Sequence, residues 1–595
     1  MRILIYDGDC GFCKYWVNWI KARAGNKIDY APYQEVKEDY PEIKEKDFEN
    51  AVQFVDENRV VYSAAGAIYK ALTYSNTHGW LHWLYSYFSP FAWFSEFFYK
   101  IVARNRYFFS EITYLLVGES FTPSTYEFAR VLFSQCLALV YLFAFSSFWV
   151  QAMGLIGSHG VMPASQILAD FATNFGWSRF FVLPTLAWIS SSDIFINGIC
   201  IAGIVSAILM FFSQRTFILF SFVCWICYLS IVNVCSDFMS FQWESLILEV
   251  GFLSIFLRSR SPILIWLYRW LLFRFMFSSA VCKIMSGDSH WRDLTALNFH
   301  FETQPLPTWV GWYFHQLPEI FHKFSVALMF IIEGLVPFLF FLPRRARYFG
   351  FFCLLGLQSL IFITGNYGFF NILSASLCLF LLDDEFLLRF KNGLTWKKNF
   401  SAAITKGLVG KAKKTLAAVG ALLLVLAGSA ELMATFRIKP TVFIPLMTVT
   451  DRFRIVGGYG LFAAMTAVRN EIIIEGSNDG KVWQEYEFKW KPGDINKRPY
   501  FVAPHQPHLD WQAWFAALGG FENQFWLHNL MVRILQGEPA VLNLLGKNPF
   551  PDGPPKAVHV LLYQYHFSDL DLHSRTGQWW TRELVGKYSP DMTLK

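Results

Sequence analysis

Long apolar runs separated by short polar breaks fill the middle of this 595-residue chain. A run of about 17–25 apolar residues is long enough to cross a bilayer as a helix. Nine runs approach or reach this length, at 128–150, 193–213, 216–236, 241–257, 262–285, 323–342, 348–365, 367–383 and 415–436. The pattern therefore predicts three parts: a soluble domain over 1–116, a polytopic α-helical membrane domain with about nine spans over 117–437, and a further domain over 438–595.

Basic residues fall at every second boundary between these runs. The clusters are Arg104/Arg106, Arg215, Arg258/Arg260, Arg344/Arg345/Arg347 and the stretch from Lys391 to Lys414. Nine crossings place all of them on one side, which the excess of Lys and Arg in cytoplasmic loops assigns to the cytoplasm. We expect the N-terminus in the cytoplasm and the C-terminal domain outside it. The short apolar segment 180–189 is expected to be re-entrant or interfacial on the far side.

The soluble N-terminal part alternates strand and helix patterns. Residues 2–6 predict a strand, 28–31 a second strand, 51–62 a hairpin and 66–72 a helix. Between the first two strands, Cys10-Gly11-Phe12-Cys13 opens a helix, whose dipole and free N–H groups favour a thiolate. We expect Cys10 to attack as the nucleophile and Cys13, one turn later, to resolve the mixed disulfide.

The residues from Tyr6 to Cys13 also resemble the DCC family of thiol-disulfide oxidoreductases, whose signature is D-x-x-C-x-x-C. Residues 103–106 fit the end of that family's domain. The resemblance implies a thioredoxin-like α/β domain in which Cys10 and Cys13 are catalytic and Asp7 and Asp9 support them.

Three other interpretations of this motif stay open. Half a zinc site would need a second nearby pair of ligands, which does not follow. A haloacid-dehalogenase phosphatase site would need Thr or Val where Gly11 stands. A degenerate domain would only bind partners. The aromatic stretch 80–109 forms helices of this domain or lies on the membrane surface, and we favour the former.

Composition agrees with a membrane protein. The chain is 54% hydrophobic, 19% aromatic and 16% charged, against about a quarter charged in soluble proteins. Its net charge of +6 resides in the clusters described above, so membrane orientation explains the charge better than nucleic-acid binding. We expect no cleavable signal peptide, because the first residues lead directly into a polar motif that contains Cys10. Ten scattered Cys predict no disulfide framework, and we expect no metal and no cofactor.

A polar segment follows the apolar run that ends near residue 285. It contains Lys283, Asp288, Trp291, His300 and Glu302. Polar groups at a membrane boundary are costly unless they are paired or hydrated, so this segment is a candidate functional site.

Residues 283–307 resemble the lipase maturation factors, membrane proteins of the secretory pathway that help certain lipases fold and dimerise. Further matches are 315–318, 364–371, 509–512 and 577–584, and the resemblance covers residues from about 125 to the C-terminus. It implies that the bilayer and exported client proteins, lipases among them, are the partners.

Two sharper interpretations concern the membrane domain. Phe277-Ser278-Ser279-Ala280 followed by Lys283 resembles the membrane domain of vitamin-K-dependent carboxylases, in which the matching Lys is the catalytic base. We favour a Lys that snorkels from a helix end. Cys224 and Cys227 form a second C-x-x-C, which is either a redox relay through the membrane or, as we favour, a pair of small packing residues.

Charged residues inside the apolar runs have an ordinary explanation too. Glu244 and Glu249 lie five positions apart in one run and do not share a helix face. We expect them to form structural hydrogen bonds inside the bundle, and Arg274 to pair with one of them.

The C-terminal part reads as β-rich with helical insertions. Residues 471–486 predict a hairpin around Asn478-Asp479-Gly480, 558–566 a strand, and 511–518 and 525–535 helices. Trp579 and Trp580 could be client contacts if exposed, although core packing is the commoner fate of such residues. The Gly-x-Ser-x-Gly motif of lipases is absent, which favours a helper of lipases over a lipase.

The sequence as a whole predicts a multi-pass maturation factor of a bacterial inner membrane, with a cytoplasmic thiol-disulfide oxidoreductase domain that exchanges electrons with a thioredoxin-like partner. A transmembrane redox transducer and a carboxylase-like enzyme that uses Lys283 are the alternatives.

Overall fold

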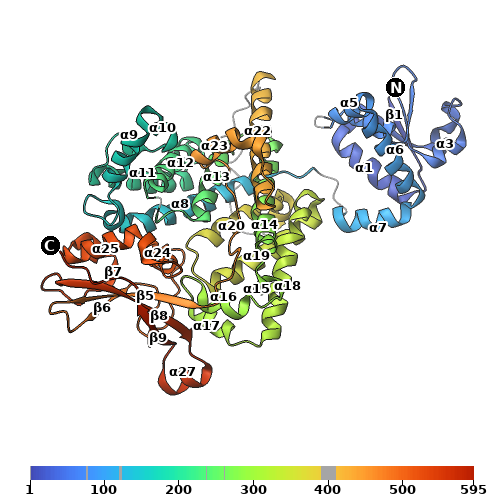
Figure 1. The fold of residues 1–595 in the computed structure, drawn as a ribbon. Helices are drawn as coiled ribbons and strands as arrows, with labels where there is room; N and C mark the ends of the chain where they lie inside the picture. The colour runs from blue at the N-terminus through green and yellow to red at the C-terminus, as the bar shows by residue number, and fades with distance from the viewer. Residues whose placement is uncertain are drawn as a thin grey trace. The chain divides into compact units, whose positions relative to one another are not determined.

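The computed structural model describes residues 2–75, 78–118, 123–235, 237–259, 261–389 and 411–594. The described residues form two compact units (Figure 1). The first comprises residues 1–125 with 342–349 and 383–385, and the second comprises the remainder.

A small α/β fold forms the N-terminal part. Its four-stranded mixed sheet has the order β2-β1-β3-β4. The central strand β1 (Ile3–Tyr6) runs parallel to β2 (Asp29–Pro32) and antiparallel to β3 (Gln53–Val55), which pairs with β4 (Val61–Ser63). Both predicted strands and the predicted hairpin are present, and their apolar residues alternate between two core clusters.

Helices cover this sheet. The first, α1 (Gly11–Ala24), joins β1 to β2, and α4 (Ala64–Leu72) follows β4. Three aromatic helices come next: α5 (Trp80–Tyr87), α6 (Ser89–Arg104) and α7 (Arg106–Val117). Pro90 stands in the first turn of α6, where a missing N–H costs nothing. Hydrogen bonds from Tyr85 and the Gly66 N–H to Glu96 tie α6 to α4 and α5, so these helices belong to the domain, as predicted.

Seven helices among the described residues are long and apolar enough to cross a membrane. They are α8 (Glu127–Ile156), α11 (Asp193–Phe212), α12 (Phe217–Val234), α14 (Pro262–Ser286), α18 with η5 (Glu319–Phe341), α19 (Arg344–Thr364) and most of α22 (Lys411–Thr435). The nine predicted spans are not confirmed, because α13 (Gln242–Ser254) and α20 with η6 (Phe370–Leu381) are shorter. Segment 180–189 forms only the short elements α10 (Arg179–Val182) and η4 (Leu186–Trp188).

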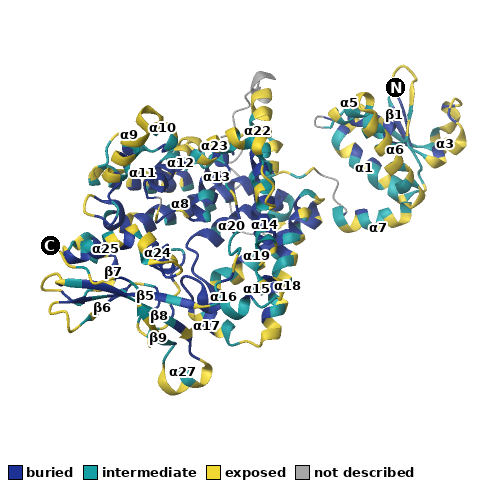
Figure 2. Ribbon diagram, viewed as in Figure 1, coloured by how far each residue is buried: buried dark blue, intermediate teal, exposed yellow. Residues whose placement is uncertain are grey.

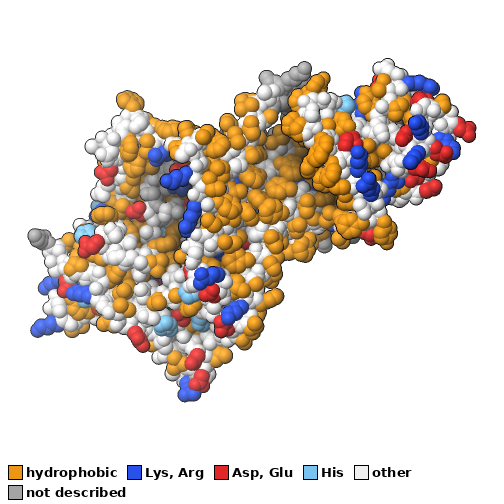
Figure 3. Space-filling view, turned by 45° about the vertical axis from the view of Figure 1, so that its right-hand side comes forward, with side chains coloured by type: hydrophobic (Ala, Val, Ile, Leu, Met, Phe, Trp, Pro, Cys, Tyr) orange, Lys and Arg blue, Asp and Glu red, His pale blue; other side chains and the backbone are white. Residues whose placement is uncertain are grey.

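The helical region is apolar outside and contains paired polar groups inside. Hydrophobic side chains cover much of its visible surface (Figure 3), whereas α13 and the facing parts of α8 and α14 are largely buried (Figure 2). Inside, Arg274 donates to Glu249, which also accepts from Tyr459, and Tyr228 donates to Glu244. The predicted pairing of Arg274 is therefore with Glu249, and both acids are partnered.

A five-stranded antiparallel sheet dominates the C-terminal part, in the order β7-β6-β5-β8-β9. The strands are β5 (Arg469–Ser477), β6 (Gln484–Phe488), β7 (Leu545–Lys547), β8 (Ala557–Phe567) and β9 (Trp580–Lys587). The inserted helices α24 (His508–Ala516) and α25 (Phe525–Leu535) agree with the predicted ones. Trp580 is buried in the core, which removes it as a client contact.

Candidate functional site

The two N-terminal cysteines meet at the start of α1. Cys10 is the N-cap of this helix, and its sulfur accepts a hydrogen bond of 3.2 Å from the Cys13 N–H. The Cys13 thiol donates to the same sulfur, with the two Sγ atoms 2.6 Å apart. Both residues are only half-buried. Cys10 therefore has the geometry of an attacking sulfur that solvent and a partner disulfide can reach, and Cys13 that of the resolving thiol.

A network of polar side chains holds the turn in front of Cys10. Gln34 of α2 (Tyr33–Val36) accepts from the Gly8 N–H at 3.0 Å. Its amide donates to Asp7 at 3.0 Å and to Asp9 at 3.3 Å. Asp7 also accepts from the Asp9 N–H. The two predicted supporting residues thus shape the turn that presents the cysteines.

Arg106 brings a positive charge to the cysteines from the first residue of α7. Its guanidinium contacts Asp7 at 3.4 Å and lies close enough to Cys10 for the two groups to interact electrostatically. Burial alone would lower the pKa of Arg106, yet the sulfurs of Cys13 and Cys10 raise it above its usual value. Burial and the hydrogen bond with Cys10 raise the pKa of Cys13 far above that of a free thiol. The site therefore keeps a proton on Cys13.

The polar side chains in and after the last turn of α14 have partners within the protein. Lys283 is buried and forms an ion pair of 2.7 Å with Glu333 of α18. Its Nζ also lies 5.4 Å from the centre of the Trp291 ring. The favoured snorkelling interpretation is wrong, because the ammonium group finds a buried carboxylate and an aromatic face within the bundle.

Asp288 and Trp291 fasten the same segment to the chain leading into the C-terminal sheet. One oxygen of Asp288 accepts from the His290 N–H, and the other accepts from the Met465 N–H at 2.5 Å. The indole of Trp291 donates to the Phe462 carbonyl.

His300 packs edge-on against Phe462, and the Tyr367 hydroxyl lies 3.3 Å from its ring nitrogen. Burial, assisted by the charge of Lys283, lowers the pKa of His300 to about 4. This histidine is therefore neutral at ordinary pH.

Glu302 faces a different surface from these four residues. Its carboxylate accepts from the Phe567 N–H at 2.7 Å and lies 3.2 Å from His566, both on β8. The predicted membrane-loop site is thus brought together only in part: Lys283, Trp291 and His300 are neighbours, and Glu302 joins the segment to the sheet.

Segments distant in the sequence converge at this junction. Asn366 donates to the Leu306 carbonyl and accepts from the N–H groups of Val502 and Ala503. The indole of Trp312 donates to the Ser568 carbonyl. The motifs near 283–307 and 364–371 therefore meet the C-terminal part at one buried polar seam within the second unit.

Comparison with known proteins accounts for all three parts. Residues 128–389 match the model of the lipase maturation factor transmembrane domain, and 455–590 match the lipase maturation factor C-terminal domain. Lipase maturation factor 2 of Gallus gallus is 33% identical, covering 78% of this chain and 81% of its own length. Lipase maturation factor 1 of Homo sapiens is also 33% identical, covering 79% and 89%. The chain belongs to the lipase maturation factor family.

Residues 4–111 separately match the model of the DCC1-like thiol-disulfide oxidoreductases. No solved structure matches the chain. This member of the lipase maturation factor family is therefore a membrane protein with a thiol-disulfide oxidoreductase domain at its N-terminus.

The second C-x-x-C of this family member lies in different surroundings. Cys224 and Cys227 are both buried in α12, and the Cys224 thiol points to the Gly203 carbonyl at 3.7 Å. Within the described part of the chain, this backbone carbonyl is the one hydrogen-bond partner of the pair. The packing interpretation fits these surroundings.

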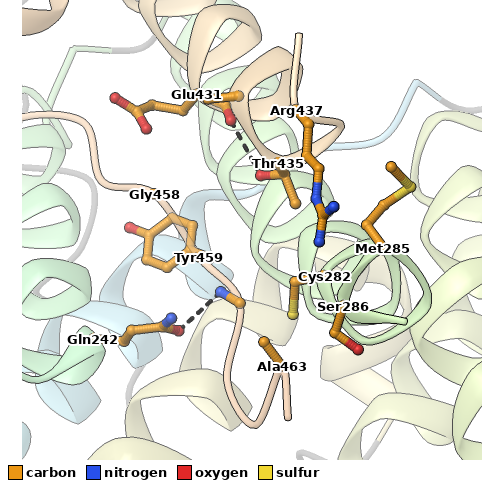
Figure 4. A pocket seen from close by; sticks show the side chains of 12 residues that line it. Gln242, Cys282, Met285, Ser286, Glu431, Thr435, Arg437, Gly458, Tyr459 and Ala463 are labelled. Carbon is orange, nitrogen blue, oxygen red and sulfur yellow. Dashed lines mark hydrogen bonds between the residues drawn. The ribbon is translucent and has the colours of Figure 1, made fainter. Parts of the chain in front are cut away.

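A pocket of about 390 Å³ opens between the C-terminal ends of α14 and α22 (Figure 4). Glu431, Arg437 and the Cys282 thiol line it, together with Gln242, whose side chain accepts from the Gly460 N–H. Glu431 lies in a candidate span, and ionisable residues in spans ordinarily face such polar cavities.

Proposed function

We propose that this protein is a maturation factor for exported proteins, lipases among them, whose N-terminal domain reduces or isomerises disulfides. The observation that carries the redox part is the Cys10 sulfur at the N-cap of α1, within reach of both Arg106 and the Cys13 N–H. Helix N-termini and adjacent cations are the two standard means of stabilising a thiolate. The order β2-β1-β3-β4 with β3 antiparallel supports a thioredoxin-like domain.

The chemistry requires no group beyond the two cysteines and a disulfide substrate. The Cys10 thiolate attacks one sulfur of the substrate, forming a mixed disulfide and releasing the other sulfur as a thiolate, which takes up a proton. Cys13 then loses its proton and attacks Cys10 Sγ, which releases the second substrate thiol. Two electrons pass to the substrate, and a Cys10–Cys13 disulfide remains. A dithiol partner of the thioredoxin type returns the domain to its starting state.

Nine crossings remain our proposal for the membrane domain, and contacts inside each unit support them. Arg130 near the start of α8 donates to the Ser261 carbonyl just before α14, so these two helices begin at the same end of the bundle. Three long spans precede Ser261, and only a fourth crossing by α13 returns the chain to that end. Arg258, which follows α13, donates to the Arg215 carbonyl, in agreement with this path.

The second short helix, α20 with η6, also returns the chain to the end of the bundle from which the preceding helix began. Arg344 at the start of α19 pairs with Asp383, which follows α20 and η6, at 2.9 Å. The chain therefore leaves and returns to one end through α19 and then α20 with η6. With α13 and α20 counted, all basic clusters fall on one side, and we assign that side and the N-terminal domain to the cytoplasm. Most of the last basic cluster, at 391–410, lies outside the described residues.

The domains we propose are 1–116, 117–437 and 438–595, with the C-terminal domain outside the cytoplasm of a bacterial inner membrane. Clients would meet that C-terminal domain and the seam around Asn366. The paired state of Lys283 supports a structural role for this residue over that of a catalytic base.

Accessibility of the cysteines tests this proposal. Intact and lysed spheroplasts are treated with a membrane-impermeant maleimide, and the peptide containing Cys10 and Cys13 is analysed by mass spectrometry. Labelling only after lysis, with the thiols mainly reduced, is the result expected of a cytoplasmic reductase. Labelling of intact spheroplasts would reverse the topology and favour direct oxidation or isomerisation of exported clients. Purification of the Cys13→Ser variant would retain substrates as mixed disulfides with Cys10 and reveal whether exported enzymes are among them.

A further inference from the structure

Helices α5 and α6 present an apolar face that their own domain leaves uncovered. Trp83, Tyr87, Trp93, Phe94, Phe97 and Phe98 form this aromatic face, and each side chain is between 48% and 76% exposed. Neither helix contains a buried residue. Within the N-terminal domain, Figure 3 shows hydrophobic side chains gathered on one side and most charged ones on another.

The opposite side of α6 carries the polar contacts with the rest of the domain. Ser95 lies 3.1 Å from the Tyr69 hydroxyl, Glu96 accepts from Tyr85 at 2.8 Å, and the Tyr99 hydroxyl accepts from the Val52 N–H. A helix on the surface of a soluble domain has the reverse pattern, with apolar residues inward and polar residues outward. The outward face of α6 is therefore suited to an apolar environment.

The rings of the aromatic face are already ordered against one another. Trp93 and Phe97 stack with centres 5.6 Å apart, and Phe94 and Phe98 lie 5.0 Å apart. Trp83 contacts Tyr87 at 5.8 Å on α5. Broad, rigid aromatic side chains of this kind are typical of helices that lie in the interface between lipid headgroups and acyl chains.

We propose that this aromatic face docks the N-terminal domain onto the surface of the lipid bilayer. Two further features favour lipid as the occupant. Residues 118–126 alone separate α7 from the candidate span α8, so the domain stays within roughly 30 Å of the start of that span even if they are fully extended. Exposed Lys100 and Arg104 at the end of α6 provide positive charge for an anionic leaflet.

Docking would place the redox site beside the membrane. Tyr107 and Phe108, which are 82% and 60% exposed, immediately follow Arg106, whose side chain lies beside Cys10. Disulfides held close to the membrane surface are therefore the substrates that this geometry favours. The docking itself does not rest on the proposed redox function.

Photocrosslinking in native membranes tests the docking. The full-length chain carries Phe97→p-benzoylphenylalanine, and the matched control carries the same change at Phe91, an inward-facing ring on the same helix that contacts Tyr69. After irradiation, peptides of α6 are analysed by mass spectrometry. We expect phospholipid adducts at position 97 at a yield several-fold above that at position 91, where crosslinks to α4 should dominate.

Three outcomes at position 97 would overturn the proposal. Crosslinks to peptides of residues 126–595 would show that the membrane or C-terminal domain covers the face. Crosslinks to a second copy, distinguished by an isotope label, would show an interface between chains. The absence of any adduct would show a face left in water. An unchanged pattern of fragments in limited trypsin digestion confirms that each variant is folded, so a misfolded protein is not mistaken for any of these results.

Discussion

Two pairs of cysteines with the same spacing stand in opposite environments in this protein. Cys10 and Cys13 occupy the first turn of α1, half-exposed, beside Arg106. Cys224 and Cys227 are buried inside α12 in the membrane region, where the Cys224 thiol contacts a backbone carbonyl. Spacing alone therefore does not define a redox site. Two thiols become a redox site when they also have a helix N-terminus, a neighbouring cation and access from solvent.

The largest expected difference is between the disulfide-reduction rates of variants that lack one cysteine of either pair. Cys10→Ser should lower the reduction of a small disulfide by the full-length protein at least roughly a hundredfold, because the nucleophile is gone. Cys224→Ser should leave the rate unchanged. Both rates are measured on protein in lipid nanodiscs, with release of a chromophoric thiol as the signal. A comparable loss in Cys224→Ser would support electron transfer through the membrane instead.

Lys283 extends the comparison to the polar groups of the membrane region. Lys283→Ala leaves the Glu333 carboxylate buried without its partner, and we expect a loss of about 3–5 kcal/mol in the free energy of unfolding. The double variant Lys283→Met, Glu333→Leu removes both charges and should recover most of this loss. Thermal unfolding of the purified variants in detergent measures the difference.

The carboxylase-like alternative makes the opposite prediction for the same residue. Under it, Lys283→Ala would keep the wild-type unfolding temperature and abolish function. In that case the double variant would be as inactive as the single one.

Arg106 is the next test of what makes the N-terminal pair different. Arg106→Gln removes the cation beside Cys10, and hydrogen bonds to charged groups contribute about 1.5–3 kcal/mol. In Arg106→Gln, we expect the alkylation of Cys10 by iodoacetamide at pH 7 to slow by roughly ten- to a hundredfold. The alkylation rate of Arg106→Lys should lie between those of the wild type and Arg106→Gln. Lys46→Gln, a change at an exposed position of the same domain, is the matched control and should have no effect.

The last test distinguishes the two cysteines of the active pair by pH. The pKa of Cys13 is raised, so Cys13 is protonated at neutral pH, and its thiolate fraction grows by up to about tenfold for each unit of rising pH. The mixed disulfide on Cys10 should therefore resolve faster from pH 7 to pH 9. Rapid quenching with acid measures its lifetime. A lifetime that does not change with pH would contradict the assignment of Cys13 as the resolving thiol.

Much of the N-terminal site could be predicted from local sequence, because its central elements are adjacent in the chain. A strand, a turn and Cys10 at a helix start follow one another directly, and the structure has them in that order. Arg106 could not be found in this way, since it lies 99 residues from Asp7 and reaches it only after the intervening helices have packed. The one sequence feature that pointed to Arg106 was its place in residues 103–106, which resemble the end of the DCC family's domain.

The membrane region shows the same limit. Apolar runs locate the long helices, but the runs at 241–257 and 367–383 form only short helices. The first contains Glu244 and Glu249, and the second turns into a 3-10 segment after Cys378. The partner of Lys283 lies 50 residues away on α18. Hydropathy cannot tell a paired buried ammonium from one that reaches to the membrane surface, so the snorkelling interpretation failed there.

The short connection at 118–126 has a consequence for how tightly the N-terminal domain needs to bind its substrates. A domain confined to a half-sphere of roughly 30–35 Å radius has an effective concentration on the order of ten millimolar towards anything else fixed at the same patch of membrane. A disulfide held there would meet Cys10 often without a dedicated binding groove. Weak, rapid encounters would then suffice, and the choice of substrate would be made by whatever brings proteins to the membrane domain.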